Sequence, residues 1–343
     1  MKITEQAAMA LATQLLIQRN ALTNHASVQA RHLVDAEMKG HPSHGLQRLP
    51  RLLTRIERGL VDPRTAGRSH WRSASVLEVD GLRGLGPVVA MAAIERLQER
   101  AATSGIALAA ISNNNHLGML ASYVESIADE GRIGIAISSS EALVHPYGGT
   151  RAMLGTNPIA IAVPTARRPL VLDLATSTVS MGKIHHHAAI GRPIPEGWAR
   201  DAEGRPTTDP ARAKGGAIAP FGGAKGYGLG IAVELLVAAL TGADLAPDIR
   251  GTLDAEAVCN KGDVLIVIDT ARSPDLALRL SAYLDAVRAS PPAEPGHPVS
   301  VPGDGAARRR EAALQAGFEI DPGLFDELTA LSRTPSSVLE GQT

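Results

Sequence analysis

The sequence predicts a mixed α/β protein whose helices and strands alternate too irregularly to specify one topology. Apolar residues at helical spacing predict helices in both terminal regions, and residues 76–80 alternate as a half-buried strand does. Further strands are expected at five apolar runs, residues 106–111, 134–137, 160–163, 170–173 and 264–269. An α+β arrangement and a doubly wound sheet both remain open, and 343 residues suffice for one large domain or two medium ones.

The first 70 residues are expected to form a helical unit. Thr4 can cap a first helix, and residues 26–38 form a second that ends at Gly40. A third helix is expected to begin at Ser43 and to stop at Gly59. Its apolar face would consist of Leu46, Leu49, Leu53 and Ile56.

The remaining chain is expected to form a sheet-containing domain over residues 71–299. Helices are predicted to begin at Pro87 and to span residues 118–129, and the stretch from Phe221 to Gly228 opens a long apolar helix that stops at Gly242. Further helices begin near Ala306 and at Pro322. We expect residues 1–70 to pack with the C-terminal helices between residues 300 and 343.

Composition excludes several classes of function. The 34 basic and 35 acidic residues give a formal net charge of −1, so nothing points to nucleic acid or an anionic membrane surface. Cys259 is the only cysteine, which excludes an internal disulfide and a cysteine-based metal cluster. The N-terminus lacks the layout of a signal peptide, and no apolar run approaches the ~18–20 residues of a membrane span. We therefore expect a cytoplasmic protein with no membrane partner.

The stretch Ser43-His44-Gly45-Leu46-Gln47-Arg48 concentrates three chemical groups at the start of an apolar-periodic segment. On a helix, His44 and Arg48 would project from one face, one turn apart. An imidazole moves a proton near neutral pH, and a guanidinium holds a planar anion through two parallel hydrogen bonds. Together they suit a small carboxylic acid that loses or gains a proton. A polar helix N-terminus with a solvated arginine is the alternative interpretation.

His116 follows an expected strand and precedes an expected helix, where rigid elements commonly hold a functional side chain. Taken alone, a turn histidine with ordinary solvation is the simpler interpretation. Together with His44 and Arg48, it indicates general acid–base chemistry at a carbon that bears a hydroxyl.

Two glycine-rich turns were weighed as phosphate sites. Gly81-Leu-Arg-Gly-Leu-Gly86 lies between a strand and a helix, but its glycine order differs from G-x-G-x-x-G and no acidic residue ends the next strand, so a Rossmann fingerprint is rejected. In Gly222-Gly-Ala-Lys-Gly-Tyr-Gly228, Lys225 precedes a helix N-terminus, although no Ser or Thr follows it as in a P-loop. This turn either binds a pyrophosphate or a substrate carboxylate, or is a flexible surface turn.

No metal site is predicted. His185-His186-His187 are consecutive and cannot easily converge on one ion, and His41 with His44 makes only a weak pair. Lys183 precedes the histidines, and its interpretation without other information is a solvated surface lysine.

In order along the chain, the motifs resemble the malate/L-lactate dehydrogenase type 2 family, which includes ureidoglycolate and sulfolactate dehydrogenases and Δ1-piperideine-2-carboxylate reductases. The resemblance extends from about residue 3 to 330. The matching motifs are Ser43-His44-Gly45 with Arg48, Asn115-His116-Leu-Gly118, Gly155-Thr-Asn-Pro158, Asp173-Leu-Ala-Thr176, Gly182-Lys183-Ile184, Pro195-Glu-Gly-Trp198, Pro206-Thr-Thr-Asp-Pro210, Gly222-Gly-Ala-Lys-Gly-Tyr-Gly228 and Pro302-Gly303.

This resemblance implies a non-Rossmann nicotinamide-binding fold, with a mixed, largely antiparallel sheet covered by helices, in a homodimer whose active site draws on both subunits. NAD or NADP would be the cofactor and a small carboxylic acid the substrate. His116 resembles the proton acceptor of the ureidoglycolate enzymes, Ser43 and His44 the proton-relay pair of the imine reductases, and Arg48 the carboxylate binder. Thr156 would lie near the substrate. The residues expected to meet the cofactor are Ser140, Leu174, Ala175, Thr176, Lys225, Gly303, Asp304 and Gly305.

One departure helps to choose among these activities. The imine reductases place an acidic residue where Lys183 stands, whereas a lysine is similar to the hydroxy-acid branch, which would place Lys183 among the catalytic residues. The expected reaction is hydride transfer between a nicotinamide and C2 of a small 2-hydroxy or 2-keto acid. A cyclic-imine carboxylate reductase and a non-catalytic ligand-binding protein remain as alternatives, and the resemblance assigns no role to His185–His187.

Overall fold

The computed structural model describes residues 1–270 and 274–333 and is built on one seven-stranded sheet. The strand order is β2-β3-β4-β11-β5-β6-β7. Only the β3–β4 pair of this sheet is parallel, and its other neighbouring strands are antiparallel. The predicted mixed α/β fold with a largely antiparallel sheet is therefore confirmed. The strands are β2 (Arg68–Trp71), β3 (Val76–Asp80), β4 (Ile106–Ser112), β5 (Ile133–Ser138), β6 (Ile159–Val163), β7 (Leu170–Leu174) and β11 (Asp263–Ile268).

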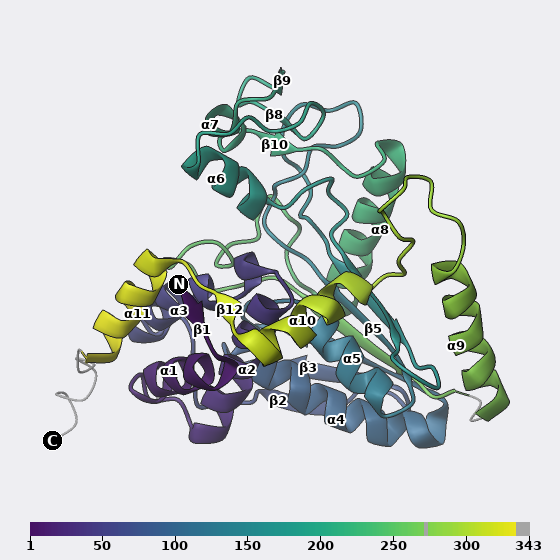
Figure 1. Cartoon of the computed structure of the whole chain (residues 1–343). Helices are drawn as coiled ribbons and strands as arrows, with labels where there is room; N and C mark the ends of the chain where they lie inside the picture. The colour runs from purple at the N-terminus through teal and green to yellow at the C-terminus, as the bar shows by residue number, and fades with distance from the viewer. Residues whose placement is uncertain (271–273, 334–343) are drawn as a thin grey trace, which may run out of the picture.

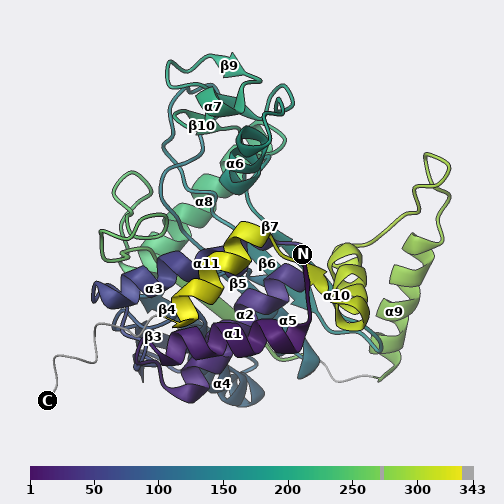
Figure 2. The ribbon, with the colours of Figure 1, turned by 60° about the vertical axis from the view of Figure 1, so that its left-hand side comes forward.

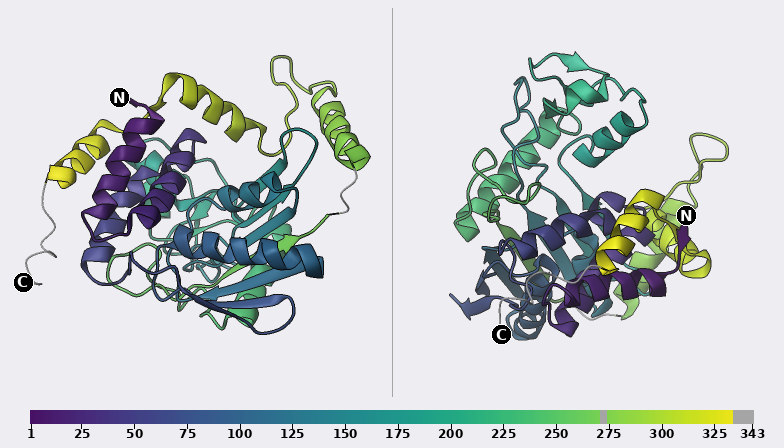
Figure 3. Two further views of the ribbon diagram at one scale, coloured as in Figure 1. Left: turned by 90° about the horizontal axis from the view of Figure 1, so that it is seen from below. Right: turned by 90° about the vertical axis from the view of Figure 1, so that its left-hand side faces the viewer.

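Helices cover both faces of this sheet (Figures 1 and 3). Alternation along β11 sends Leu265 and Val267 towards α4 (Gly86–Ser104) and α5 (Ala121–Asp129). Val264 and Ile266, on the opposite face, pack with α8 (Ala224–Thr241). Because both faces are covered, the inner strands β4, β5, β6 and β11 consist of nearly continuous apolar runs, as the sequence indicated.

The N-terminal helices pack with the C-terminal ones (Figure 2). Strand β1 (Lys2–Ile3) pairs with β12 (Phe318–Glu319), and one apolar cluster unites residues from Ile3 to Leu328. The division at residues 70 and 300 stays a prediction, and residues 334–343 lie outside the described part of the chain. The helices of this region are α1 (Glu5–Ile17), α2 (Thr23–Met38), α3 (Leu49–Glu57), α10 (Asp304–Ala316) and α11 (Pro322–Arg333).

A smaller lobe at the top of Figure 1 was not anticipated. It has its own apolar cluster, which includes Val144, Ile184 and Ile218. Its two-residue strands and short helices leave little periodic signal in the sequence. They are α6 (Met181–Ala189), β8 (Ala199–Arg200), β9 (Pro206–Thr207), α7 (Pro210–Ala213) and β10 (Ala217–Ile218). Helix α9 (Pro274–Arg288) lies at another edge of the molecule. There, the Ala166 N–H in the turn between β6 and β7 donates to the Ala277 carbonyl at 3.1 Å, and Oγ of Ser281 donates to Oγ1 of Thr165 at 3.0 Å.

The expectation that no apolar run reaches the length of a membrane span is wrong for α8. This helix is long and apolar enough by length and composition, and 28% of it is buried in the structure. Its middle, however, carries Glu234, which is buried and accepts hydrogen bonds from Gly155, Asn157 and Ala246. Since a buried carboxylate requires such partners, α8 is built to pack within protein.

Candidate active site

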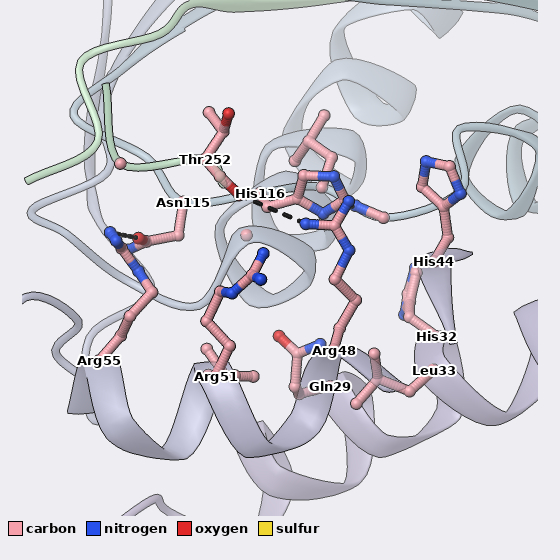
Figure 4. Close-up of a pocket in the computed structure, with 15 residues that line it drawn as sticks. Gln29, His32, Leu33, His44, Arg48, Arg51, Arg55, Asn115, His116 and Thr252 are labelled. Atoms are coloured by element: carbon pink, nitrogen blue, oxygen red, sulfur yellow. Dashed lines mark hydrogen bonds between the residues drawn. The ribbon is translucent and has the colours of Figure 1, made fainter. Parts of the chain in front are cut away.

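A pocket lies where α2, residues 44–55, residues 115–118 and the Gly251-Thr252 turn meet (Figure 4). The structure thus brings together His44 and Arg48 with His116, which were predicted to meet although they lie far apart in the sequence. The imidazole centroids of His44 and His116 are 5.6 Å apart, with the rings inclined by 27°.

The segment that carries Ser43, His44 and Arg48 is not the single helix that the apolar spacing predicted. It forms two 3₁₀ turns, η1 (Pro42–His44) and η2 (Leu46–Arg48), before α3 begins at Leu49. Gly45 interrupts the helix with φ −97° and ψ −148°. A Cβ there would lie 2.4 Å from Oε1 of Glu37, an oxygen that accepts the Leu46 N–H at 2.7 Å.

Glu37 is therefore the support of the His44 turn. Its side chain fills the space behind Gly45 and ties the start of η2 to α2. Burial raises the pKa of Glu37 to about 7, against the opposing effect of hydrogen bonds from the backbone of Leu46 and Gln47. This carboxyl group consequently changes its charge near neutral pH.

His44 is held by its neighbour. Nδ1 of His44 lies 3.0 Å from Oγ of Ser43, the pair expected from the sequence. Burial, and then the positive charge of Arg48, lower the pKa of His44 to about 3. His44 is therefore neutral at physiological pH and able to accept a proton.

Two glycines, Gly81 and Gly86, allow the backbone near His116 to pass close to the start of α4. Their sequence pattern was tested above only against a nucleotide-binding loop. A Cβ on Gly86 would lie 2.3 Å from the carbonyl oxygen of His116, and one on Gly81 would lie 2.8 Å from that of Asn113. Glycine is required at both positions because two backbones pass close together there, and phosphate binding is not needed to explain it. Asn115 adds side-chain bonds to the carbonyls of Arg83 and Gly84, both at 2.8 Å, so the segment before His116 is fixed.

Three arginines line the pocket (Figure 4). Arg48 donates from Nε to the Ser43 carbonyl at 2.8 Å and from Nη1 to the Thr252 carbonyl at 3.3 Å. Burial and then the charge of Arg51 lower its pKa to about 10, so it stays cationic. Arg55 donates to Oδ1 of Asn115 at 3.0 Å. Arg51 is exposed and makes no hydrogen bond or ion pair within residues 1–270 and 274–333.

Sequence reasoning missed Arg51, Arg55 and His32 as pocket residues. Arg51 follows Arg48 by three positions and Arg55 follows Arg51 by four, so helical spacing would have placed all three on one face. No pattern in the sequence marks His32, which reaches the pocket from α2.

Several residues expected near substrate or cofactor form a separate hydrogen-bonded group. Oγ of Ser140 accepts the Thr156 N–H at 3.0 Å, and the Thr156 carbonyl accepts both the N–H and the hydroxyl of Thr176, at 2.8 and 2.9 Å. Leu174 ends β7, and Ala175 links it to Thr176. These residues lie at the ends of neighbouring strands β5, β6 and β7, outside the set that lines the pocket.

The other predicted residues lie apart from the pocket lining. Lys225 is exposed in the first turn of α8, after Gly222 and Gly223, whose φ angles of 56° and 63° favour glycine. Gly303 lies against Val171 of β7, where a Cβ would approach the Val171 carbonyl oxygen to 3.0 Å, and Gly305 follows in α10. Both carboxylate oxygens of Asp304 accept hydrogen bonds from Arg288, at 2.8 and 2.9 Å.

Helix α6 brings Lys183 and the three histidines to the same side of the molecule as the His44 turn. A Cβ on Gly182 would lie 2.9 Å from Cβ of Ser43, and Lys183 itself is exposed. His187 lies 2.9 Å from the Pro193 carbonyl and against Trp198. Within residues 1–270 and 274–333, no three His, Cys, Asp or Glu side chains form a group that would hold a metal ion.

Comparison with known proteins decides the family. The family model described as malate/L-lactate dehydrogenase matches residues 3–329. The chain belongs to the malate/L-lactate dehydrogenase family. Members of this family are oxidoreductases, and the fold described above is theirs.

Three known proteins illustrate what this chain is similar to. A dehydrogenase from Sinorhizobium meliloti superposes with a TM-score of 0.93 at 55% identity, over 97% of this chain and 98% of that one. The (2R)-3-sulfolactate dehydrogenase (NADP(+)) of Chromohalobacter salexigens is 37% identical over 89% of this chain and 90% of its own. The Δ1-pyrroline-2-carboxylate/Δ1-piperideine-2-carboxylate reductase of Pseudomonas putida is 39% identical over 67% and 68%.

Proposed function

We propose that this protein is an NAD(P)-dependent dehydrogenase that oxidises the C2 hydroxyl of a small 2-hydroxy acid and runs the reverse reduction. The observation that carries the proposal is the pairing of His44 and His116, 5.6 Å apart, in the pocket that also holds Arg48. This grouping supports anion binding and proton transfer acting on one small molecule.

The arginines favour an acid with a second anionic group. Arg48 spends Nε and Nη1 on backbone carbonyls, which leaves Nη2 for a substrate carboxylate. Arg51 has no described partner and lies one helical turn further along the same face, so it supplies a second cation. The named substrate of the Chromohalobacter relative carries both a carboxylate and a sulfonate, which agrees with such a pair.

Substrate binding would also prepare the imidazoles. Burial, and then the positive charge of Arg48, lower the pKa of both His44 and His116. A carboxylate bound to Arg48 offsets that charge, so the pKa of each imidazole rises only when substrate is present. A weak base in the empty pocket thus becomes a stronger one in the complex.

The residues near Thr156 fit a nicotinamide cofactor and suit NAD and NADP equally well. Hydroxyl groups gather at Ser140, Thr156 and Thr176, next to the buried Oδ1 of Asn157, which has no described hydrogen-bond partner. Lys225, after two left-handed glycines, supplies a cation for a pyrophosphate. When bound, the cofactor supplies the acceptor for the C2 hydride, while this chain's residues bind, orient and deprotonate the acid.

A second candidate activity, reduction of a cyclic imine carboxylate, is favoured by the likeness to the Pseudomonas putida reductase, and Lys183 in place of an acidic residue speaks against it. A non-catalytic ligand-binding protein would have no chemical use for His44, His116 and Arg48 together.

Absorbance of the reduced nicotinamide, followed with both cofactors, separates these activities. The panel contains monoanionic and dianionic 2-hydroxy acids, the matching 2-keto acids, and cyclic imines. We expect turnover of 2-hydroxy and 2-keto acids, fastest with a second anionic group. Turnover of imines alone would establish the second candidate, and cofactor binding without any turnover would overturn the proposed reaction.

We also propose that a second copy of the chain covers the outer face of α8. That face exposes Leu229, Ile231, Leu235 and Leu236, with Leu235 54% exposed. Large apolar side chains that gather on the exposed side of one helix are typical of a protein–protein interface. Leu235→Glu should convert a dimer to a monomer in light scattering, whereas Leu314→Glu, 47% exposed on α10, should leave the mass unchanged. A monomeric wild-type protein would contradict the proposal.

A further inference from the structure

The imidazoles of His44 and His116 differ in the hydrogen-bond partner of the ring nitrogen Nδ1. Nδ1 of His116 accepts the backbone N–H of Gly118 at 3.0 Å, which is the only hydrogen bond to this ring within residues 1–270 and 274–333. Gly118 reaches this position because its φ of +78° folds the chain back towards the ring. A backbone N–H can only donate, so Nδ1 carries no proton here, and the proton of the neutral ring sits on Nε2.

Protonation of His116 is opposed from several elements. The side chains around it that carry or gain positive charge are Arg48 of η2, Arg51 of α3, His44 of η1 and Lys261 before β11. Lys261 is itself ion-paired with Asp263, and no acidic group is among the main influences on the ring. Burial and these charges hold the pKa of His116 well below its usual range, so the ring stays neutral with its hydrogen on Nε2.

Burial and Arg48 also disfavour protonation of His44, but the hydrogen bond at Nδ1 of His44 does not fix which ring nitrogen carries the hydrogen. Its Nδ1 faces the hydroxyl of Ser43, which donates or accepts according to the orientation of its hydrogen. When Nδ1–H donates to Oγ of Ser43, Nε2 of His44 presents a lone pair. Proton uptake at Nε2 then preserves the bond to Ser43, whereas in His116 the Nε2 lone pair would require a hydrogen on Nδ1 and loss of the Gly118 bond.

We propose that His116 is a permanent hydrogen-bond donor to the C2 oxygen of the substrate, through Nε2–H, and that His44 is the group that exchanges the proton. This assignment rests on the proposed function and ranks two imidazoles that the sequence left equal. In oxidation the substrate O–H bond would break as an N–H bond forms at Nε2 of His44. A nicotinamide, when bound, would supply the acceptor for the hydride lost from C2, so that the two electrons are accounted for. In reduction both transfers reverse.

Substitutions that mimic one ring nitrogen at a time test the assignment. Glutamine places an amide N–H near the position of Nε2, and asparagine places one near Nδ1. His116→Gln should keep kcat within about tenfold of wild type, because a donor remains, whereas His116→Ala and His116→Asn should lose ~10²–10³-fold, the usual effect of removing such a donor. His44→Gln should lose ~10²–10⁴-fold and the acidic limb of the pH–rate profile, which His116→Gln should retain.

Nitrogen NMR of the wild-type protein labelled at histidine provides a readout that needs no turnover. We expect one ring, identified by its loss in His116→Gln, to show an unprotonated Nδ1 and a protonated Nε2 at every pH from about 5 to about 9. Titration of this ring within that range, or a hydrogen on its Nδ1, would overturn the assignment.

The two levels of proposal fail differently. Wild-type activity on 2-hydroxy acids, combined with His116→Gln as inactive as His116→Ala, would overturn the donor role and leave the proposed function standing. Absence of any turnover in the wild type, with the NMR pattern as expected, would overturn the proposed function and leave the state of His116 established.

Discussion

The two histidines of the pocket rest on different kinds of support. His116 follows a central strand, and backbone contacts fix it, through Gly86 on one side and the Gly118 N–H on the other. His44 lies on a short 3₁₀ turn that a side chain, Glu37, ties to α2. A backbone contact cannot change with pH, whereas a carboxylate can. The donor role proposed for His116 and the proton-transfer role proposed for His44 thus fall on supports that suit each task.

The largest expected effect comes from breaking the support of His116. Gly86→Ala adds a Cβ 2.3 Å from the carbonyl oxygen of His116. Because that oxygen belongs to the backbone, either the segment after β4 or the start of α4 must shift. We expect a loss of about 3 kcal/mol or more in unfolding free energy, at the upper end for single substitutions, and loss of activity. Gly215→Ala, whose Cβ would meet only Ala202 at 3.9 Å, is the control. Equal stability of both variants by denaturant unfolding would contradict the close-contact argument.

This support shows where prediction from sequence stops. Residue chemistry identified His44, Arg48 and His116, because imidazole and guanidinium have few other uses in such clusters. The glycines of residues 81–86 were considered only as a phosphate loop, since a close passage of two distant backbones leaves no local pattern. The helix expected from Ser43 failed for a similar reason: apolar spacing was correct, but the Glu37 carboxylate behind Gly45 is a tertiary contact.

The fold divides in the same way. Strands β3 to β7 and β11 were predicted, because each is an apolar run bounded by turn residues. Strand β2 alternates exposed and half-buried side chains at the edge of the sheet, and the strands of the small lobe have two residues each, which is too short for a period. Order along the chain also says nothing of β11 lying between β4 and β5, since that position depends on long-range pairing.

Removal of the Arg48 side chain is expected to have a smaller effect than Gly86→Ala. Arg48 supplies a positive charge to the pocket and also holds the backbone of Ser43. Arg48→Ala removes the bond to the Ser43 carbonyl and the cation beside the substrate, each worth about 1.5–3 kcal/mol for a charged hydrogen bond. We expect kcat/KM to fall ~10²-fold for every acid accepted.

Arg51→Ala, one turn away, should raise the KM of dianionic acids by ~10-fold and leave the KM of monoanionic acids unchanged. If Arg51→Ala changed the KM of dianionic and monoanionic acids equally, Arg51 would not be the site for a second anionic group.

The smallest effect should come from the support of His44, and its sign depends on pH. The pKa of Glu37, about 7 in the folded protein, lies above its ordinary value of 4.5, so the folded state binds a proton more tightly than the unfolded state. The resulting stabilisation is complete below about pH 4.5 and is lost as the pH rises through about 7. Glu37→Gln does not titrate and should match wild type near pH 5, yet exceed its unfolding free energy by about 2 kcal/mol at pH 8.

Denaturant unfolding of wild type and Glu37→Gln at several pH values measures this difference directly. The depressed pKa values of His44 and His116 act with the opposite sign, because a histidine that stays neutral in the fold destabilises it as the pH falls below about 6.5. Both proteins share that contribution, so it cancels in the comparison. A gap that stays constant with pH would show that Glu37 is ionised throughout, and that the turn beneath His44 is as insensitive to pH as the strand end beneath His116.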